Sequence, residues 1–428
     1  MQDLKNIKLN PGFKSGTVAV PSSKSISHRA IICAGLAENG ESHINNIDMS
    51  EDVQATTDAM RVFKNYKNAE NIIIHCKESG SLLRFLIPVA AALGINATFT
   101  GEGTLLGRPI SLYQDLFADK GVSIQSTLLT VPVIIRGKLS AGKFYVPGNI
   151  TSQYITGLLF ALPLLDGDSE IILTSPLESE PYVDITVDVL KVFGITVDKT
   201  KDGYSVKGNQ AYKSADYVVE GDYSQAAFFA SAAAINGDIA IKNLNPKSHQ
   251  GDYKIIDILR DFGAKVYFDG DVLRASKGEN LRGIKLNMPK NRQTSLSDFS
   301  SKFSIDASQI PDLVPVLSVV AAYADGETVI YNARRLRIKE SDRIRAVYDM
   351  LTAIGSNVRE ADDGLIIRGT GGKKLPGGVV KSVNDHRIAM SAAVASINTE
   401  NGVIIDDMTC INKSYPMFLR DLLALDIL

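Results

Sequence analysis

The sequence has no tryptophan, few cysteines and histidines, and almost no net charge. Its three cysteines, Cys33, Cys76 and Cys410, are odd in number, widely spaced and match no metal-ligand spacing. We expect buried, unreactive thiols in a reducing compartment. The five histidines show no HExxH pairing, so no metal site is predicted. With 46 basic against 48 acidic residues, the chain lacks the basic excess typical of nucleic-acid and membrane-surface binders.

Long apolar runs and cofactor motifs are also missing. No stretch approaches the roughly 18 apolar residues of a transmembrane helix, and "MQDLKNIKLN" lacks the apolar segment of a signal peptide. No GxxxxGK[ST] phosphate loop occurs, because "RGTGGKKLPGG" has the wrong spacing, and no GxGxxG follows an early strand. We therefore expect a cytoplasmic protein with no membrane or nucleic-acid partner, whose site works without a cofactor.

Apolar residues are abundant enough for large cores. The chain has 428 residues, of which 45% are hydrophobic and 22% charged, values typical of globular proteins. Its length exceeds one ordinary domain, so we expect two large domains.

One sequence phrase recurs along the chain. It is an Ala-rich helix, apolar nearly all round, that ends at Gly, Asn or Asp and runs into a β-branched strand. Its copies cover residues 29–47, 81–101, 152–173, 224–244, 311–332 and 387–408. Because these helices lack a polar face, we expect them to be buried inside their domains.

A second phrase is an amphipathic helix that ends at Gly before a short strand, with apolar residues at i, i+3, i+4 and i+7. Its copies cover residues 110–125, 185–198, 254–268 and 347–360, with weaker ones at 56–74 and 417–428. The two phrases together give six units, which divide most simply into two domains of three. A chance recurrence of Ala-rich helices is the alternative.

Polar residues gather before each buried helix, in "KSISHR", "ESGSLLR", "GNITSQ", "EGDYSQ", "SQIPD" and "NDHR". Ser, Thr and Asp at these positions are ordinary capping residues. The cations are different, because a helix dipole disfavours positive charge at its N-terminus. They are Lys24, Arg29, Arg84 and Arg387. If the three buried helices of a domain run parallel, their N-termini converge on one face and form an anion site.

A further group of cations lies in "NARRLRIKESDRIR", residues 332–345, directly after the strand "ETVIYN". A solvated helix in which Glu340 and Asp342 pair with nearby cations is one interpretation. The position at a strand end instead favours a site, as in other α/β proteins. Arg108 and Lys413 add cations beside proline-containing turns. The pattern indicates a site for a multiply charged anion.

In order, and over nearly the whole chain, a series of motifs resembles those of the 5-enolpyruvylshikimate-3-phosphate synthases. The motifs are "VPSSKSISHRA", "SGSLLRFL", "GRPI", "TSQYITGLL", "EPYVDIT", "IPDLVPVL", "RLRIKESDRI", "NDHRIAM" and "NKSYP". The resemblance implies transfer of the enolpyruvyl group of phosphoenolpyruvate to the 5-hydroxyl of shikimate 3-phosphate, with release of phosphate, through a tetrahedral intermediate. This reaction belongs to the pathway to aromatic amino acids. It needs no cofactor, and we expect a monomer.

The resemblance also implies an α/β fold of a particular kind. It is an inside-out α/β barrel of two domains, each of three βαβαββ repeats, with the active site in the interdomain cleft. The chain would cross between domains near Val20 and near Asp222. One domain, on the shikimate 3-phosphate side, would hold residues 20–222, and the other residues 1–19 plus 223–428.

Site residues follow from the family's motifs. Those for shikimate 3-phosphate would be Lys24, Ser25, Arg29, Thr151, Ser152, Gln153, Ser179, Asp312 and Lys339. Those for phosphoenolpyruvate, whose oxygens suit arginine forks, would be Lys24, Gly80, Arg108, Gln153, Arg343, Arg387 and Lys413. Because carboxyl groups suit reversible proton transfer, the predicted catalytic residues are Asp312 and Glu340, with Lys24 and Lys413. His28 is expected to be a bystander.

Three residues depart from the family's usual pattern. Glu78 stands where many members have Asn, and a carboxylate repels a phosphate, so backbone N–H groups near Gly80 are expected to bind instead. Thr151 replaces Ser but keeps the hydroxyl. Arg335 stands where some relatives have Asn.

Other functions compete with this one. The sister enzyme that transfers the same group to UDP-N-acetylglucosamine usually has a reactive cysteine near Arg108, and "GEGTLLGRPI" has none. A non-catalytic phosphoanion-binding protein on the same fold would not need Asp312, Glu340 and Lys413 together. An RNA-end enzyme of related repeat fold would need a catalytic histidine and a more basic surface.

Overall fold

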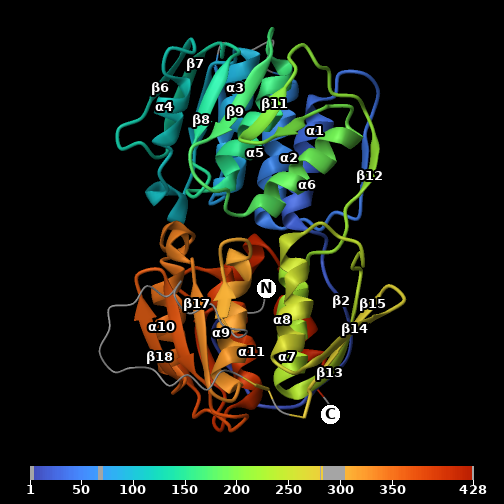
Figure 1. Ribbon diagram of the computed structural model, residues 1–428, viewed down its shortest axis with the longest axis vertical. Coiled ribbons are helices and arrows are strands. Elements are labelled where there is room, and N and C mark those ends of the chain that lie inside the picture. Colours follow the sequence, from blue (N-terminus) through green and yellow to red (C-terminus); the bar gives the residue numbers. More distant parts are fainter. Residues whose placement is uncertain (1–3, 66–70, 280, 283–303, 427–428) are drawn as a thin grey trace. The chain divides into compact units, whose positions relative to one another are not determined.

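The computed structural model describes residues 4–65, 71–279, 281–282 and 304–426 (Figure 1). The chain forms two compact units. The middle unit is Ser22–Glu220, and the terminal unit combines Met1–Pro21 with Gly221–Leu428. Each unit has a hydrophobic core of its own.

The described part of the middle unit contains three sheets, ordered β4-β5-β7-β6, β10-β11-β9-β8 and β12-β3. Its helices are α1 (Lys24–Leu36), α2 (Glu51–Lys64), α3 (Gly80–Leu93), α4 (Leu112–Phe117), α5 (Ser152–Ala161) and α6 (Glu180–Val192). Its strands are β3 (His43–Asn45), β4 (Ile72–His75), β5 (Ala97–Thr100), β6 (Val122–Gln125), β7 (Val133–Gly137), β8 (Lys143–Val146), β9 (Ser169–Leu173), β10 (Asp198–Thr200), β11 (Gly203–Val206) and β12 (Asp216–Val218).

The described part of the terminal unit also contains three sheets, ordered β1-β21-β20, β14-β15-β13-β2 and β16-β17-β19-β18. Its helices are α7 (Tyr223–Asn236), α8 (Ile255–Asp261), α9 (Val314–Tyr323), α10 (Arg343–Ala353), α11 (His386–Ala395) and α12 (Phe418–Leu423). Its strands are β1 (Lys5–Leu9), β2 (Lys14–Ala19), β13 (Gly237–Lys242), β14 (Lys265–Asp269), β15 (Val272–Ser276), β16 (Ser304–Asp306), β17 (Glu327–Tyr331), β18 (Asn357–Ala361), β19 (Gly364–Arg368), β20 (Gly378–Val380) and β21 (Val403–Asp407).

All six copies of the apolar phrase fold as predicted, as a buried helix followed by a strand. They are α1–β3, α3–β5, α5–β9, α7–β13, α9–β17 and α11–β21. In four of them the helix connects two parallel neighbours, as α3 does between β4 and β5. Every residue of α9 is buried, as the lack of a polar face predicts.

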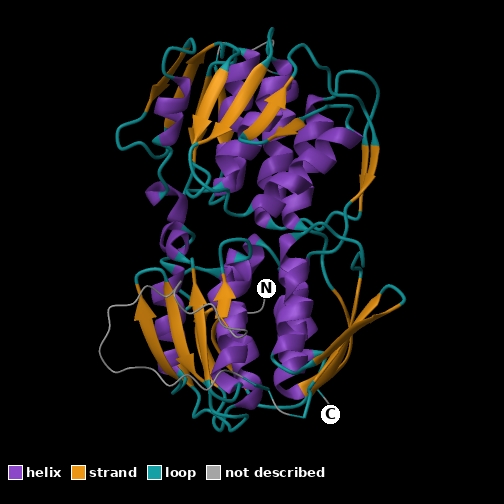
Figure 2. Ribbon diagram, viewed as in Figure 1, coloured by secondary structure: helices purple, strands orange, loops and turns teal. Residues whose placement is uncertain are grey.

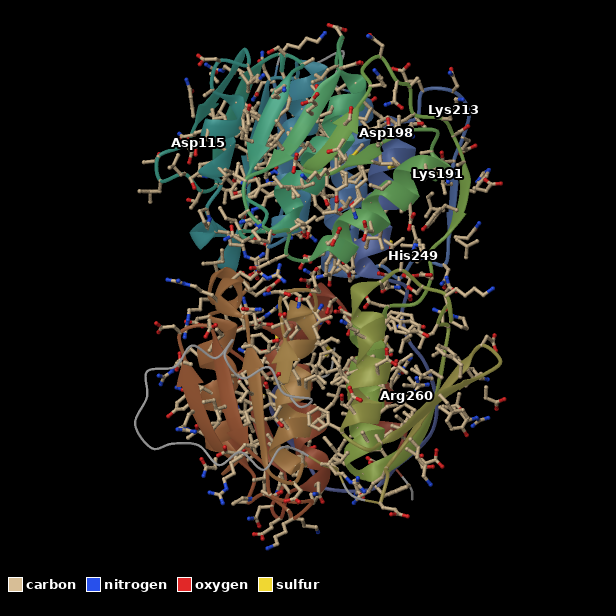
Figure 3. The ribbon with its side chains drawn as sticks, in the orientation of Figure 1. Asp115, Lys191, Asp198, Lys213, His249 and Arg260 are labelled. Atoms are coloured by element: carbon tan, nitrogen blue, oxygen red, sulfur yellow. The ribbon has the colours of Figure 1, made fainter. Side chains whose placement is uncertain are left out.

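The amphipathic phrase folds as predicted in α4–β6, α6–β10, α8–β14 and α10–β18. The weaker copies contain α2 and α12, and parts of them, residues 66–70 and 427–428, lie outside the described residues. In Figure 2 the strands of the terminal unit lie around helices α7, α9 and α11, which pack against one another. Charged residues labelled in Figure 3, such as Lys191 and Arg260, are exposed.

β2 and β12 lie next to the two points where the chain passes between the units, and each pairs with a strand from a distant part of the sequence. β2 precedes α1 in sequence but pairs in parallel with β13, the strand that follows α7. β12 precedes α7 but pairs in parallel with β3, the strand that follows α1. Each unit therefore completes one strand–helix–strand arrangement with a strand from a distant part of the sequence. Among the described residues, no helix has both the length and the apolarity to cross a membrane.

Candidate functional site

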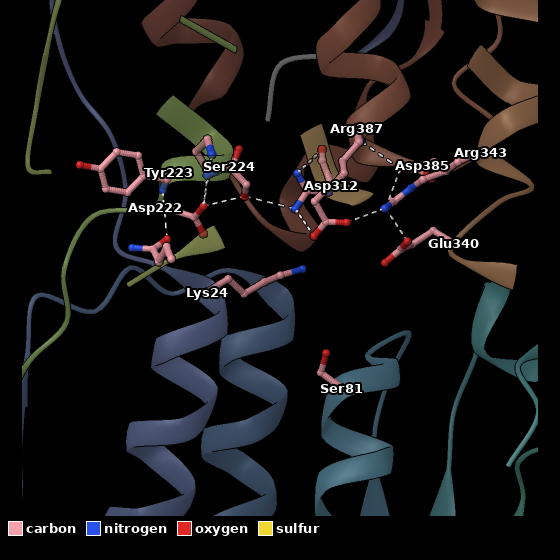
Figure 4. A network of polar contacts seen from close by, with 12 residues as sticks. Lys24, Ser81, Asp222, Tyr223, Ser224, Asp312, Glu340, Arg343, Asp385 and Arg387 are labelled. Atoms are coloured by element: carbon pink, nitrogen blue, oxygen red, sulfur yellow. Dashed lines mark hydrogen bonds and ion pairs between the residues drawn. The ribbon is translucent and has the colours of Figure 1, made fainter. Parts of the chain in front are cut away.

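In the terminal unit, Arg387 joins the N-terminal ends of three buried helices (Figure 4). It is the second residue of α11, and its Nη2 donates to Asp312 Oδ2 at 2.9 Å and to Ser224 Oγ at 3.2 Å. Asp312 lies in the 3-10 segment Pro311–Leu313 directly before α9, and Ser224 lies in the first turn of α7. The predicted convergence of helix N-termini is therefore confirmed within this unit.

Arg343, the first residue of α10, holds three carboxylates (Figure 4). Its Nε donates to Asp385 Oδ2 at 2.8 Å, its Nη1 to Asp312 Oδ1 at 2.9 Å, and its Nη2 to Glu340. Asp385 is fully buried and caps α11 by accepting the backbone N–H of Arg387 at 2.9 Å. One guanidinium, only 1% exposed, thus orients both carboxylates predicted to be catalytic.

The charges around Asp312 control its protonation. Burial by itself raises the pKa of Asp312, but the positive charges of Arg387, Lys339 and Arg343 outweigh burial and hold this pKa well below its usual range. The pKa of Lys339 is lowered to about 8, chiefly by burial and against the attraction of Asp312. Asp312 is therefore a carboxylate at neutral pH, whereas Lys339 titrates just above it.

Lys413 is held by a strained turn. Its Nζ donates to the carbonyl of Asn384 at 3.0 Å. Asn384 has a φ of 56° and Val383 a φ of 48°, and such values are rare for a β-branched residue. The turn presents the Asn384 carbonyl to Lys413 and then places Asp385 at the start of α11.

In the middle unit, Gln153 links the N-terminal ends of α3 and α5. Its Nε2 donates to Ser81 Oγ at 2.8 Å, and its Oε1 accepts from Arg84 Nη1 at 2.7 Å. Arg84 also donates through Nη2 to the carbonyl of Pro109 at 3.0 Å. Gln153, predicted to contact both substrates, is therefore fixed at a helix N-terminus by a neighbouring cation.

Arg108 lies against the first residue of α3, Gly80. A Cβ atom on Gly80 would stand 2.5 Å from Arg108 Nη1 and 3.2 Å from Arg84 Nη1. A side chain at this position would have to displace these guanidinium groups. Two arginines and a helix N-terminus together favour an anion, such as a carboxylate or a phosphate.

Lys24 and Ser25 begin α1, as predicted. Lys24 Nζ donates to Asp52 Oδ2 in the first turn of α2 at 2.8 Å, and the lysine side chain is 18% exposed. The carboxylate of Asp52 therefore holds the lysine that the sequence predicts to contact both substrates.

Arg29 is buried, and most of its donors bond within the protein. Its Nε donates to Thr186 Oγ1 at 2.8 Å, and its Nη2 donates to the carbonyl of Tyr182 at 2.7 Å. Its Nη1 donates to the carbonyl of Ser25 at 2.5 Å. Burial lowers the pKa of Arg29 to about 10. Besides being a predicted ligand, Arg29 therefore ties α1 to α6.

The hydroxyls predicted to hold the shikimate phosphate lie at the N-termini of α5 and α6. Thr151 caps α5, accepting a backbone N–H two residues on at 3.3 Å, and Ser152 is the first residue of that helix. Ser179 precedes α6 with a φ of 55°. The two preceding loops are joined where Glu178 N donates to the carbonyl of Gly148 at 3.0 Å.

Some contacts of the site residues are not predictable from the sequence. Asp385 stands in "NDHR" as an ordinary cap, and nothing local indicates its pairing with Arg343. Arg335, a departure from the family pattern, donates to the carbonyl of Ser308 at 2.5 Å. His28 is buried with Nδ1 at 2.6 Å from Thr56 Oγ1, and burial lowers the pKa of His28 to about 3. A neutral, buried ring agrees with the predicted bystander role.

The cysteines are all buried, as predicted, and burial raises the pKa of each thiol, that of Cys410 to about 12. Within the described ranges, no group of three or more His, Cys, Asp or Glu side chains is placed to hold a metal ion.

Comparisons with known proteins identify the family of the chain. The sequence profile of the family described as EPSP synthase (3-phosphoshikimate 1-carboxyvinyltransferase) matches residues 11–422. Two relatives named 3-phosphoshikimate 1-carboxyvinyltransferase come from Clostridium novyi (strain NT) and Clostridium acetobutylicum. The first is 42% identical and covers 98% of this chain and 97% of its own length. The second is 44% identical and covers 97% of this chain and 96% of its own length.

A solved structure of EPSP synthase from Acinetobacter baumannii has the same fold. It superposes with a TM-score of 0.76 at 28% sequence identity and covers 99% of this chain and 98% of its own. With the profile match and the full-length relatives, this shows that the chain belongs to the EPSP synthase (3-phosphoshikimate 1-carboxyvinyltransferase) family.

Proposed function

We propose that this chain transfers the enolpyruvyl group of phosphoenolpyruvate to the 5-hydroxyl of shikimate 3-phosphate and releases phosphate. The activity is that of a 3-phosphoshikimate 1-carboxyvinyltransferase, a step in aromatic amino acid biosynthesis. The observation that carries the proposal is the pair of carboxylates, Asp312 and Glu340, held by Arg343 in a chain of this family. Two polyanionic substrates also account for the cations at the helix N-termini.

We propose that each unit is a domain built as an inside-out α/β barrel of three βαβαββ repeats. The proposed domains are residues 20–222 and residues 1–19 plus 223–428. Support comes from the three sheets and three buried helices of each described unit. The substrates would bind in the interdomain cleft, because the predicted ligands are divided between the units.

The proposed ligands are those that the family resemblance implies, and their charges suit the two anionic substrates. The phosphate of shikimate 3-phosphate would bind the hydroxyls of Thr151, Ser152 and Ser179 at two helix N-termini. The rest of that substrate would contact Lys24, Ser25, Arg29, Gln153, Asp312 and Lys339. Phosphoenolpyruvate would bind Arg108, the backbone N–H of Gly80, and Lys24, Gln153, Arg343, Arg387 and Lys413. Each cation matches a carboxylate or phosphate oxygen.

In the addition step, the 5-hydroxyl oxygen attacks C2 of phosphoenolpyruvate while a proton is added to the C3 methylene. Asp312 would take the hydroxyl proton, and Glu340 in its acid form, assisted by Lys413 or Lys24, would deliver the proton to C3. With the contacts that the structure shows, Asp312 is a weak base because the surrounding cations lower its pKa. Substrate anions on Arg387 and Lys339 would screen those cations and raise the pKa, so binding itself would activate the base.

In the elimination step, a carboxylate takes one proton from the new methyl group and the double bond re-forms. The C2–oxygen bond to phosphate breaks, and phosphate leaves with the electron pair. Arginine and lysine at the phosphate would stabilise the charge that develops on the leaving group.

An assay of inorganic phosphate release tests the proposal. The protein is mixed with phosphoenolpyruvate and either shikimate 3-phosphate or UDP-N-acetylglucosamine, in a chelator. We expect phosphate release in the mixture that contains shikimate 3-phosphate and none in the mixture that contains UDP-N-acetylglucosamine. Release with the UDP-sugar would identify the sister enzyme, and no release with either would favour a binding protein. The cytoplasmic location and the monomeric state stay predictions, which fractionation and sedimentation would test.

A further inference from the structure

Two segments of the middle unit run side by side just before α3. The backbone N–H of Cys76 donates to the carbonyl of Thr100 at 2.8 Å, and that of Glu102 donates to the carbonyl of Lys77 at 2.9 Å. Glu78 continues this pairing with its side chain. Its Oε2 accepts both the backbone N–H and the hydroxyl of Thr104, each at 2.9 Å.

The backbone at Gly103 is shaped for this contact. Gly103 has a φ of 54°, and a Cβ atom there would collide with the Glu78 carboxylate. Glycine at position 103 therefore leaves room for the Glu78 carboxylate to reach Thr104, the next residue. A carboxylate that accepts two hydrogen bonds at one oxygen is a firm anchor for a short loop.

The anchored loop carries Arg108. The 3-10 segment Gly103–Gly107 begins at the Glu78 contact, and Arg108 follows it directly. On the far side of Arg108, the carbonyl of Pro109 accepts from Arg84 Nη2 at 3.0 Å and from the hydroxyl of Tyr154 at 3.1 Å. Arg108 thus lies between two fixed points.

We propose that Glu78 is a positioning residue: by anchoring residues 103–107 it keeps the Arg108 guanidinium over the N-terminus of α3. The role rests on the proposed function, because its consequence is the affinity of Arg108 for phosphoenolpyruvate. The carboxylate does not act as an anion that repels substrate. Its negative charge is directed at the loop, where the N–H and O–H of Thr104 meet it.

Steady-state kinetics of Glu78→Ala, Glu78→Gln and Glu102→Ala test the role. Glu78→Ala leaves the N–H of Thr104 without its acceptor, so we expect the KM for phosphoenolpyruvate to rise about tenfold. The kcat and the KM for shikimate 3-phosphate should change by less than about twofold, since the anchor acts through Arg108 alone. Glu78→Gln keeps an acceptor oxygen and should be intermediate. Glu102→Ala removes an exposed carboxylate from the same turn and should match the parent.

A fluorescent reporter measures the mobility of residues 103–107 in a way that does not depend on enzyme activity. The sequence has no tryptophan, so Leu106→Trp, at a position 52% exposed, gives a single probe within the anchored segment. In this background Glu78→Ala should lower the fluorescence anisotropy, whereas Glu102→Ala should not. The thermal unfolding midpoint should stay within a few degrees of the parent, because Glu78 is only partly buried.

Three outcomes would overturn the proposal. A lower or unchanged KM for phosphoenolpyruvate in Glu78→Ala would mean that Glu78 repels the substrate or has no role. An equal effect of Glu102→Ala would mean that only net charge matters. Unchanged anisotropy would mean that the loop needs no anchor. If the parent itself releases no phosphate, the proposed function fails, and the anisotropy still reports whether Glu78 holds the loop.

Discussion

Asp312 and Glu340 illustrate how single arginines set the chemistry of neighbouring carboxylates. Arg343 fixes both, and its burial means that water does not compete for the same donors. Buried charges of this kind are costly to leave without partners. Arg343 therefore stabilises the fold and also orients Asp312 and Glu340.

Replacing Arg343 with methionine should destabilise the protein by about 3–5 kcal/mol, because the fully buried Asp385 loses its main cation. Urea unfolding measures the change. Arg345→Met is the matched control, since Arg345 lies in the same helix, is 58% exposed and pairs with Asp349 at the surface. Equal unfolding midpoints for the two variants would contradict the structural role of Arg343.

Lys339 should give the reaction a basic pH limit. Its pKa is lowered to about 8, so it is charged below that pH and neutral above it. The kcat/KM for shikimate 3-phosphate should therefore fall as pH rises through about 8. Lys339→Arg keeps its charge, so the fall should move to higher pH. If the fall near pH 8 persists in Lys339→Arg, another group is responsible.

At the scale of elements, the site depends on helices that approach one another closely. α3 and α5 pack together, and Gln153, Ser81 and Arg84 join their N-termini. Gly157 in α5 allows this approach, because a Cβ atom there would lie 2.9 Å from Pro88 Cγ and 3.0 Å from Tyr113 Oη.

Gly157→Ala should separate α3 from α5 and destabilise the protein by about 1–3 kcal/mol. It should also lower kcat/KM, because Gln153 and Arg84 shift with their helices. Gly107→Ala is the control for stability, since no atom lies within 4 Å of its Cβ position. Urea unfolding and steady-state kinetics of both variants check this prediction. If Gly157→Ala is as stable as the parent, the space between α3 and α5 accommodates a methyl group and the prediction is wrong.

At the scale of the whole molecule, two cores are joined by two passages of the chain. The passages fall near residues 21–22 and 220–221. Near them, β2 pairs with β13 and β12 pairs with β3. The proposed ligands belong to both units, for example Lys24 to the middle unit and Arg387 to the terminal unit.

Binding of both substrates should therefore make the molecule more compact. Like-charged lysines and arginines repel one another until anions arrive, and ligand then favours the compact state. Small-angle X-ray scattering should show a smaller radius of gyration with shikimate 3-phosphate plus a non-reacting phosphoenolpyruvate analogue than without ligands. The control uses Lys24→Ala with the same ligands, and an unchanged radius in the parent would contradict closure.

The positions of the helices and strands, and the kind of chemistry, follow from the sequence alone. Helix and strand positions follow from local periodicity, so α9 and its five counterparts are found where the apolar phrase places them. Cations at helix starts indicated an anion site, because a dipole and a charge of the same sign are unfavourable unless something neutralises them. Motifs in "KSISHR", "RIKESDRIR" and "NDHR" then named the family.

Contacts between residues that are far apart in the sequence depend on how the chain packs. Arg343 and Asp385 are 42 residues apart, and Arg387 and Ser224 are 163 apart, so no local pattern predicts that they bond. The partner of β2 is likewise set by topology, since the strand beside it comes after α7 rather than after α1. Glu78 reads as a repulsive neighbour in the sequence but contacts Thr104 in the fold. Periodicity records what each residue meets within a turn or a strand, whereas these contacts arise from the packing of distant segments.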